Sequence, residues 1–497
     1  MPGGPGGPGG PPPAPPAGPP SGRRRRTGLL VGLVAIVVLA LVAGAGVWAL
    51  ASRDDDRAVT ASAESPALGS GGSSGEPGPE PPGTDRVVIE GGSASDRSQK
   101  VMRAAIADVD GYWRVTYPRV FDGRYVTVEG GFHAVDDGQT APCSESPDDV
   151  QGNAYYCPGQ DLVAWDADGL VPYMVKTYGP LGLGLVVAHE WGHAIQARAQ
   201  VSGPTVFVEQ QADCFAGAWV DHVRDQDDPY FRVDGNSLDL ALAGFLELRD
   251  APGSSAASSQ AHGTAFDRIR AFQEGVEGGA EACAAYTVDN LAPKLTDIRF
   301  TTQDDLDSGG NLPLQQAFDL TVADLTDFWT RAWSELGGTG TFAAPELKVF
   351  SKGEAPRCPS RVGLSGEVFF CPATNVLAVQ DDGLVVELHD RIGDFALGEV
   401  LGSGYSLSAL HQLGDLAKPS ARTTRAADCL AGVWSASVFT QNRQGAQLQL
   451  SPGDLDEAVA ALLATADQSK GSVTGTGADR VAAYRSGFMD GFDACGP

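Results

Sequence analysis

The chain carries one ordered set of sequence features twice, and this internal repeat constrains its fold more than any other feature. The matching pairs of segments are Tyr112-Trp113 and Phe328-Trp329, LVAWDADGLV (162–171) and VLAVQDDGLV (376–385), ADCFAGAW (212–219) and ADCLAGVW (427–434), and Asp267-Arg268 and Asp479-Arg480. Several matches in one order define two copies of a single folding unit. The sequence therefore predicts two similar domains at 100–285 and 317–497, joined by a polar connector at 286–316.

The cysteines follow the same repeat. All 8 lie within the two copies, in equivalent positions. An even number of cysteines in an exported region is typical of disulfides. The repeat then predicts four pairs, two in each copy: Cys143–Cys157, Cys214–Cys283, Cys358–Cys371 and Cys429–Cys495.

The N-terminal region has the composition of a membrane anchor and its flanks. Residues 1–27 are rich in Pro and Gly and end in an arginine cluster, and residues 28–51 are apolar without a charge. This run is long enough to span a bilayer, and the arginines before it place the N-terminus in the cytoplasm. A cleaved signal peptide is the alternative, but the run is longer than a usual signal core, which favours an uncleaved anchor. Residues 52–99 then predict a flexible stalk, and the two copies are expected outside the cytoplasm.

The net charge of -28 excludes one class of partner. Nucleic acids need a positive protein surface, so we expect no nucleic-acid binding. The membrane, through one transmembrane helix, and a peptide or protein substrate are the expected partners, and no partner protein is identified.

The first copy contains a zinc-binding pattern. His189 and His193 are four residues apart inside an apolar stretch that predicts a helix over 181–200. This spacing places both imidazoles on one helix face, where they can bind one Zn²⁺, with Glu190 beside them as the general base. Glu209, near the start of a second predicted helix, is the expected third ligand. Asp213, one turn later, is expected to accept a ring N–H from one of the histidines.

HEWGHAIQ followed by EQQADCFAGAW resembles the putative neutral zinc metallopeptidases, over about residues 100–285. The resemblance implies a zincin-type α+β domain with zinc on His189, His193 and Glu209 and with Glu190 as the catalytic base. The second copy has Leu401 to Ser406 where the first has its histidines, and Thr424 in place of Glu209. We therefore interpret residues 317–497 as a degenerate copy that keeps the fold without the catalytic groups.

The sequence predicts an α+β protein with an N-terminal transmembrane helix and two zincin-like domains. Its expected function is that of a membrane-anchored, extracytoplasmic zinc metallopeptidase. A structural zinc is less favoured, because closed zinc sites mostly use cysteines and those are better explained as disulfides. The alternative function is a non-catalytic envelope protein that binds partners through paired zincin-like folds.

Two short strands are expected around Tyr155-Tyr156 and 163–165. In a zincin one such strand borders the cleft and can pair with an extended peptide. An ordinary core hairpin explains the same pattern equally well, so the sequence leaves both interpretations open.

Overall fold

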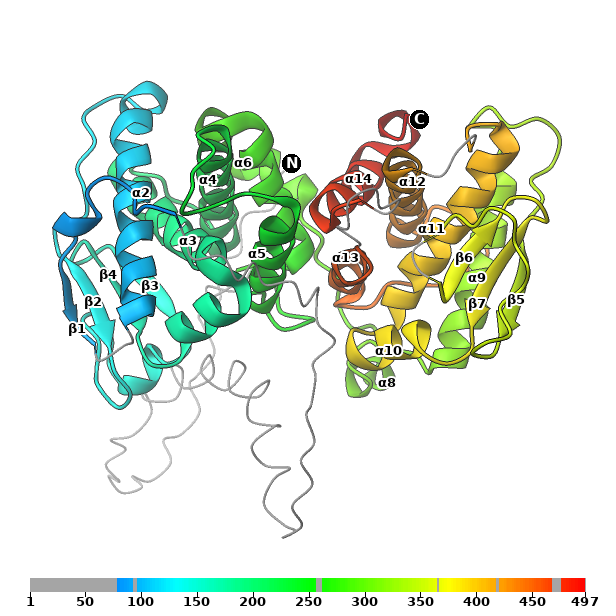
Figure 1. Cartoon of the computed structure of the whole chain (residues 1–497), viewed down its shortest axis with the longest axis horizontal. Coiled ribbons are helices and arrows are strands. Elements are labelled where there is room, and N and C mark those ends of the chain that lie inside the picture. Colours follow the sequence, from blue (N-terminus) through cyan, green and yellow to red (C-terminus); the bar gives the residue numbers. More distant parts are fainter. Residues whose placement is uncertain are drawn as a thin grey trace, which may run out of the picture. The chain divides into compact units, whose positions relative to one another are not determined.

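The structure, a computed structural model, describes residues 78–92, 96–255, 262–363, 366–416, 420–466 and 475–496. The expected tail at 1–27 and the expected membrane span at 28–51 lie outside the described residues. The described residues belong to one compact unit, Ala58–Pro497. They form a mixed α+β structure that is mostly helical and contains two small sheets, which confirms the predicted fold class at this level (Figure 1).

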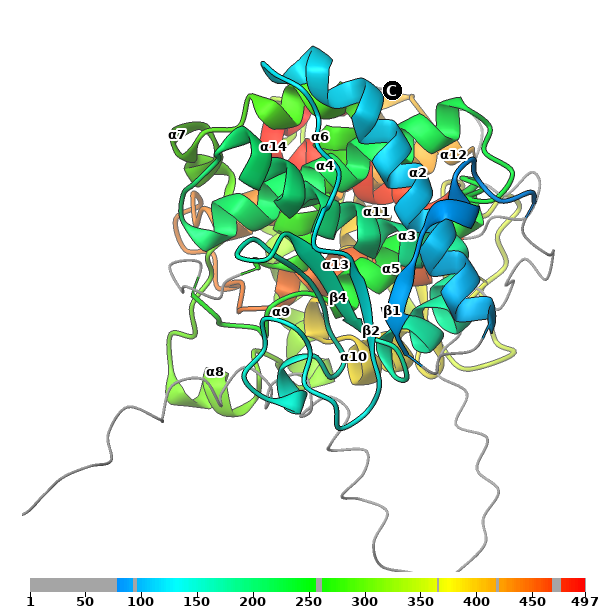
Figure 2. The ribbon, with the colours of Figure 1, turned by 90° about the vertical axis from the view of Figure 1, so that its left-hand side faces the viewer.

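The first copy contains a four-stranded sheet in the order β1-β2-β4-β3. Its strands are β1 (Ile89–Gly91), β2 (Phe132–Val135), β3 (Ala154–Cys157) and β4 (Leu162–Asp166). Strands β1, β2 and β4 run parallel, and β3 pairs with β4 in the antiparallel direction. Figure 2 shows β1, β2 and β4 side by side. Strand β3 pairs only with β4 and forms one edge of this sheet, and its residues are partly buried whereas all five β4 residues are buried.

Strand β1 differs from the sequence prediction. It lies in the segment assigned to the flexible stalk, and the short 3-10 helix η1 (Thr84–Arg86) precedes it. Its register aligns Ile89 with Phe132 of β2. An isolated strand of three residues carries little sequence signal, but the backbone edge of β2 supplies partners for its hydrogen bonds. The folded part of the chain therefore begins before residue 100.

Helices surround the site in the first copy. They are α2 (Asp96–Val120), α3 (Leu170–Ala199), α4 (Thr205–Asp225), α5 (Gly235–Glu247) and α6 (Ala265–Ala284). Helix α3 begins earlier than predicted and has a break at Gly179, where φ is 73°. Among the described helices, α3 is the one long and apolar enough to cross a membrane, but 67% of its most apolar window is buried inside the fold. We therefore interpret α3 as the core helix of this copy.

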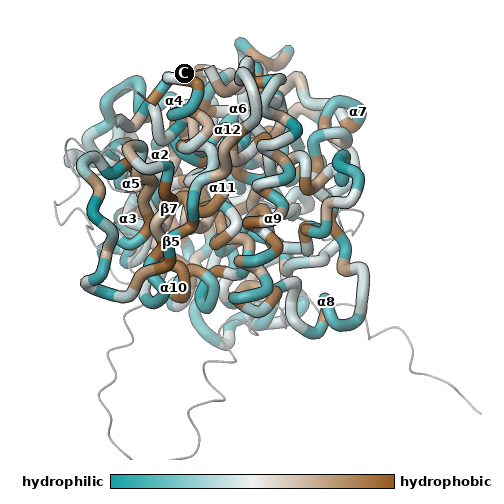
Figure 3. Tube along the Cα trace, turned by 90° about the vertical axis from the view of Figure 1, so that its right-hand side faces the viewer, coloured by the Kyte–Doolittle hydropathy of each residue, from teal (hydrophilic) through white to brown (hydrophobic). Residues whose placement is uncertain are grey.

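The second copy repeats this arrangement. Its elements are α9 (Leu314–Ala332), β5 (Glu346–Phe350), β6 (Val368–Cys371), β7 (Val376–Gln380), α10 (Leu384–Arg391), α11 (Asp394–Leu413), α12 (Ala421–Phe439), α13 (Asp454–Ala464) and α14 (Gly477–Asp490). Strand β5 is parallel to β7 and β6 is antiparallel to it, as β2 and β3 are to β4. Figure 3 shows the hydrophobic character of the β7 segment, whose residues are all buried.

Individual contacts repeat as well. The indole N–H of Trp219 in α4 donates to Asp108 of α2 at 2.7 Å, and that of Trp434 in α12 donates to Asp324 of α9 at 2.8 Å. Four disulfides join the same pairs of cysteines that the repeat predicts. Two of them tie α4 to α6 and α12 to the segment after α14.

The connector is less extended than predicted. Residues 286–316 contain α7 (Val288–Leu291), the 3-10 helix η3 (Ala292–Lys294) and α8 (Gln303–Asp307), and they include the first residues of α9. Thr287 and Thr302 cap α7 and α8 with their side chains. These caps satisfy first-turn N–H groups and explain why short helices form in a polar, Gly-containing segment.

The two copies contact each other through equivalent surfaces. The amide of Gln273 in α6 accepts a hydrogen bond from Arg485 in α14, and these residues are 212 positions apart, the spacing between Asp267-Arg268 and Asp479-Arg480 in the same two helices. A residue that contacts its own counterpart lies near a local two-fold axis. The copies are therefore arranged as a dimer is, within one chain.

Candidate metal centre

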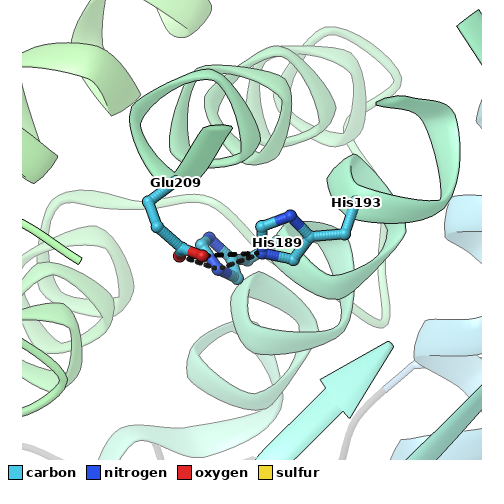
Figure 4. A group of neighbouring side chains, drawn as sticks. All are labelled: His189, His193 and Glu209. Atoms are coloured by element: carbon cyan, nitrogen blue, oxygen red, sulfur yellow. Dashed lines mark hydrogen bonds and ion pairs between the residues drawn. The ribbon is translucent and has the colours of Figure 1, made fainter. Parts of the chain in front are cut away.

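The close approach of α3 and α4 brings the sequence-predicted site residues together. A Cβ atom added to Gly192 would lie 2.8 Å from Cα of Ala212, so only glycine fits on α3 at this crossing. Because the helices cross here, His189 and His193 on α3 face Glu209 on α4. Figure 4 shows the three side chains converging from the two helices.

The three side chains place one nitrogen or oxygen each around a common point. The Nε2 atoms of His189 and His193 are 3.2 Å apart. Glu209 Oε2 lies 3.2 Å from Nε2 of His189, and Glu209 Oε1 lies 3.5 Å from Nε2 of His193. His189 and Glu209 are buried, with exposed fractions of 7% and 8%.

The outward ring nitrogens fix the protonation pattern of both histidines. His189 Nδ1 lies 2.7 Å from Asp213 Oδ1, and His193 Nδ1 lies 2.9 Å from Gln196 Oε1. The amide of Gln196 is oriented by its Nε2, which donates to Val208 O and to Gln211 Oε1. Because both outward partners are acceptors, each Nδ1 carries a proton, and each Nε2, once it has given up its own proton, presents a lone pair to the common point.

This arrangement fits a tetrahedral zinc ion. Ligand bonds of about 2.0–2.1 Å in tetrahedral geometry separate two ligand atoms by about 3.3 Å. The separations of 3.2, 3.2 and 3.5 Å are close to that value. In addition, Glu209 Oε2 is buried and has no hydrogen-bond partner other than the His189 imidazole that it faces at 3.2 Å. Three converging electron-pair donors are what a cation requires, and the chemistry of the set (two imidazoles and one carboxylate) is that of a zinc site.

Charges around the cluster shift the pKa values of its groups. Burial alone would lower the pKa of His189, but the Asp213 carboxylate outweighs it and raises this pKa to about 10. Burial would likewise raise the pKa of Glu209, yet the two histidines, in their protonated form, donate to its carboxylate and hold this pKa well below its ordinary value. Glu209 is therefore ionised. The surroundings stabilise positive charge at this point.

Glu190 lies on the same helix and contacts the edge strand of the sheet. Its Oε2 accepts a hydrogen bond from the backbone N–H of Tyr156 in β3 at 2.8 Å. Burial raises the pKa of Glu190 above its ordinary value, although the two neighbouring histidines lower it. A carboxyl group with a raised pKa next to the histidines has the properties of a general base or acid.

Two supporting residues were not predicted from the sequence. Arg268 in α6 donates from Nε to Asp213 Oδ2 at 2.9 Å and from Nη2 to Asp213 Oδ1 at 2.8 Å. The only available signal for Arg268 was its recurrence in the repeat. Gln196, which orients His193, is one turn after it on α3 and carried no distinguishing signal. Burial raises and Arg268 lowers the pKa of Asp213, with the net shift downward, so Asp213 is a charged acceptor for His189.

The second copy has a closed hydrogen-bonded network at the corresponding position. Ser403 in α11 occupies the place of His189, and its Oγ lies 2.8 Å from both Glu399 Oε1 and Asp428 Oδ1. Arg480 donates to Asp428 in the same way as Arg268 donates to Asp213. No histidine lies in this network.

A second group of acidic side chains lies close together in the described residues, formed by Asp394, Asp454 and Glu457. Each of its members accepts a backbone N–H, from Leu312, Ser451 and Phe395 respectively. Two of the acids stand at the beginnings of α11 and α13, where the helix dipole favours negative charge. We therefore interpret this group as carboxylates held by backbone N–H donors near helix N-termini.

Comparisons with known proteins agree with the geometry. The family model described as "Putative neutral zinc metallopeptidase" matches residues 27–286. The chain is 27% identical over 199 residues to the uncharacterized protein YpfJ of Escherichia coli K12, a match that covers 34% of this chain and 66% of YpfJ, just under two thirds of its length. It is 26% identical over 245 residues to the uncharacterized protein Rv2575 of Mycobacterium tuberculosis H37Rv, covering 42% of this chain and 78% of Rv2575. No solved structure matches the chain.

Proposed function

This chain belongs to the putative neutral zinc metallopeptidase family, and from that premise we propose that it is a membrane-anchored peptidase that hydrolyses peptide bonds outside the cytoplasm. In this proposal His189, His193 and Glu209 hold Zn²⁺, and Glu190 is the general base. Residues 317–497 form a degenerate zincin-like domain that holds no zinc.

One observation carries the proposal. Two imidazole nitrogens and the Glu209 carboxylate converge at separations of 3.2, 3.2 and 3.5 Å, and the outward hydrogen bonds of both rings leave each Nε2 to bind a cation. Among the residues that the structure describes, three protein groups take part, which leaves a fourth position for water or substrate, as in catalytic zinc sites. A closed structural site would use four protein ligands.

The side chains around the cluster divide the chemistry between them. When bound, Zn²⁺ supplies a Lewis acid that acidifies water and polarises a carbonyl group. The Glu190 carboxylate accepts the proton of the attacking water and delivers it to the nitrogen of the leaving amine. Asp213 holds His189 in the tautomer that leaves Nε2 free of a proton, and Gln196 does the same for His193.

We assign the substrate to the edge of the sheet formed by β3. The backbone N–H of Tyr156 on this edge lies beside Glu190. An extended peptide that adds to a sheet edge is held by main-chain hydrogen bonds. Peptide bound along β3 would bring a scissile bond past Glu190 and the two histidines, and Tyr156 N–H would be released to the substrate as Glu190 turns to the water.

The proposed location follows from two features of the chain. Residues 28–51 have the composition of a single membrane span that follows four arginines. The described part of the chain contains four disulfides and no free cysteine. Disulfides persist in oxidising compartments, which supports a domain outside the cytoplasm.

Hydrolysis of a peptide library by the purified full-length protein tests the proposal. We expect Glu190→Gln to keep zinc and the fold but to lower the rate of hydrolysis about 10²–10⁴-fold, because an amide cannot accept the proton of water. Ser403→Ala, which alters the equivalent network of the second copy, is the matched control and should keep full activity. Undiminished hydrolysis by the Glu190 variant would contradict the assigned base, and a wild-type protein without zinc or hydrolysis would favour the non-catalytic envelope protein.

A further inference from the structure

The two copies cap each other's helices through a reciprocal pair of buried aspartates. Asp456 in α13 accepts the backbone N–H of Phe266, in the first turn of α6, at 2.8 Å. Asp239 in α5 accepts the N–H groups of Gly477 and Ala478, in the first turn of α14, at 2.7 and 2.8 Å. Both aspartates are buried, with exposed fractions of 5% and 7%. Each copy therefore satisfies first-turn donors of the other, which a helix cannot satisfy internally.

The cap provided by Asp456 leads directly to the metal centre. Phe266 is two residues before Arg268, whose guanidinium group forms a two-fold hydrogen bond with Asp213. Asp213 in turn accepts the ring N–H of His189. Three contacts thus connect a side chain of the second copy with an expected zinc ligand of the first.

A second contact of Asp456 supports the same arginine. Asp456 Oδ2 lies 3.3 Å from Nε of Arg249, which follows the end of α5. The preceding residue, Leu248, accepts a hydrogen bond from Arg268 through its carbonyl oxygen. Asp456 therefore contacts both chain segments that position the Arg268 guanidinium, the backbone of Phe266 and the side chain of Arg249.

The equivalent series of contacts, from Asp239 of the first copy into the second copy, does not lead to a metal ligand. Asp239 caps α14 two residues before Arg480, and Arg480 binds Asp428 at 2.7 and 3.0 Å. Asp428 contacts Ser403, the residue in the place of His189. The described residues thus contain two equivalent, similarly buried aspartate caps. The cap formed by Asp456 is connected to the His-His-Glu cluster, and the cap formed by Asp239 is not.

We propose that Asp456 of the degenerate copy is a positioning residue for the metal centre, and that the second copy thereby tunes the zinc affinity of the first. This inference rests on the proposed function, because it takes the His-His-Glu cluster as a zinc site. Without Asp456, the N–H of Phe266 loses its acceptor, and the Thr264 side chain, which accepts the N–H of Asp267, is left to hold the first turn of α6. Arg268 lies in this weakened turn. Asp213 then holds His189 less firmly, although the ligands themselves are unchanged.

Zinc affinity of matched full-length variants tests the proposal. The dissociation constant of Zn²⁺ is measured by competition with a chromophoric chelator for wild type, Asp456→Ala, Asp456→Asn and Asp239→Ala, together with each melting temperature. Removing a group that orients a ligand directly weakens metal binding 10–100-fold, so we expect about 3- to 10-fold for Asp456→Ala, which acts one step further away. Asp456→Asn keeps an acceptor oxygen for Phe266 N–H and should lie between this variant and wild type.

The Asp239 variant separates positioning from stability. Asp239→Ala should lower the melting temperature about as much as Asp456→Ala, because both remove an equivalent buried cap, but its zinc affinity should stay within about twofold of wild type. Equal zinc affinities of the two alanine variants, whether both weakened or both unchanged, would overturn the positioning role. A wild-type chain that binds no Zn²⁺ would instead overturn the proposed function itself.

Discussion

The two copies place the same buried ion pair behind different side chains. In the first copy Asp213 and Arg268 support His189, and in the second Asp428 and Arg480 support Ser403. The pair is thus present whether or not a metal ligand stands in front of it. Removing one member of a buried ion pair leaves an unpaired buried charge and lowers the stability of the fold by about 3–5 kcal/mol. Replacing His189 would leave the Asp213–Arg268 pair intact and would not carry this penalty. The comparison teaches that the Asp–Arg pair is part of the architecture and that the zinc ligands are an addition to it.

The largest expected difference between the copies is metal retention. His193→Ala should reduce bound zinc from about one ion per chain to less than about 0.1, because two protein ligands seldom retain zinc against water and buffer. The matched control, Ser403→Ala in the second copy, should leave the zinc content unchanged. Elemental analysis of the dialysed proteins measures both values, and stoichiometric zinc in the His193 variant would mean that the ligands are misassigned.

Substitutions in the two Asp–Arg ion pairs should have intermediate effects on zinc affinity. Asp213→Asn should weaken Zn²⁺ binding about 10–100-fold, because a neutral amide orients His189 less firmly than a carboxylate does. Asp428→Asn should destabilise the fold similarly but should not alter zinc affinity, because no zinc ligand lies beside it. Chelator competition and thermal melting separate the two effects. Equal zinc affinities in the two variants would remove Asp213 from the metal site.

The smallest expected effect concerns the closed network of the second copy. Ser403 has one hydroxyl proton and lies 2.8 Å from both Glu399 and Asp428, so a neutral Glu399 must supply the second proton. Burial accordingly raises the pKa of Glu399 to about 8, against the opposing charge of Arg480. A carboxyl group whose pKa is raised on folding stabilises the protein below its unfolded pKa, and this stability is lost as the pH rises to about 8.

Glu399→Gln removes this pH dependence, because the amide N–H₂ can donate to Ser403 at every pH. The melting temperature of wild type should therefore fall relative to that of the variant between about pH 5 and pH 8. Glu387→Gln, at an exposed position of α10, serves as the control for general effects of charge removal. If the melting temperatures of wild type and the Glu399 variant changed in parallel with pH across this range, Glu399 would be ionised in the folded state.

Local patterns explain which parts of the site could be predicted from the sequence. The spacing of His189 and His193 is a property of one helix, and Glu209 and Asp213 are one turn apart on the next, so helical periodicity was sufficient for these positions. Arg268 contacts Asp213 from 55 residues away, and Asp456 contacts Phe266 from 190 residues away. Contacts over such separations depend on how helices pack, and no local pattern encodes them.

The same reasoning applies to the fold. The repeat could be recognised because the same short motifs occur twice in one order. The two sheets and the four disulfides have equivalent positions in the two copies. Strand β1 was missed because a strand of three residues carries little sequence signal and Ile89–Gly91 forms its hydrogen bonds through pairing with β2. Helices α7 and α8 of the connector were missed because each is only four or five residues long and its main local signal is a threonine N-cap.

The central claim is that one of two structurally equivalent positions binds zinc. Anomalous diffraction at the zinc absorption edge, from crystals of the protein purified without added chelator, tests this most directly. The account predicts one anomalous peak per chain, about 2.0–2.2 Å from Nε2 of His189, Nε2 of His193 and a Glu209 oxygen, and none near Ser403 and Thr424. A peak at the Ser403 position, or a zinc ion bound elsewhere while the His189 cluster holds none, would contradict it.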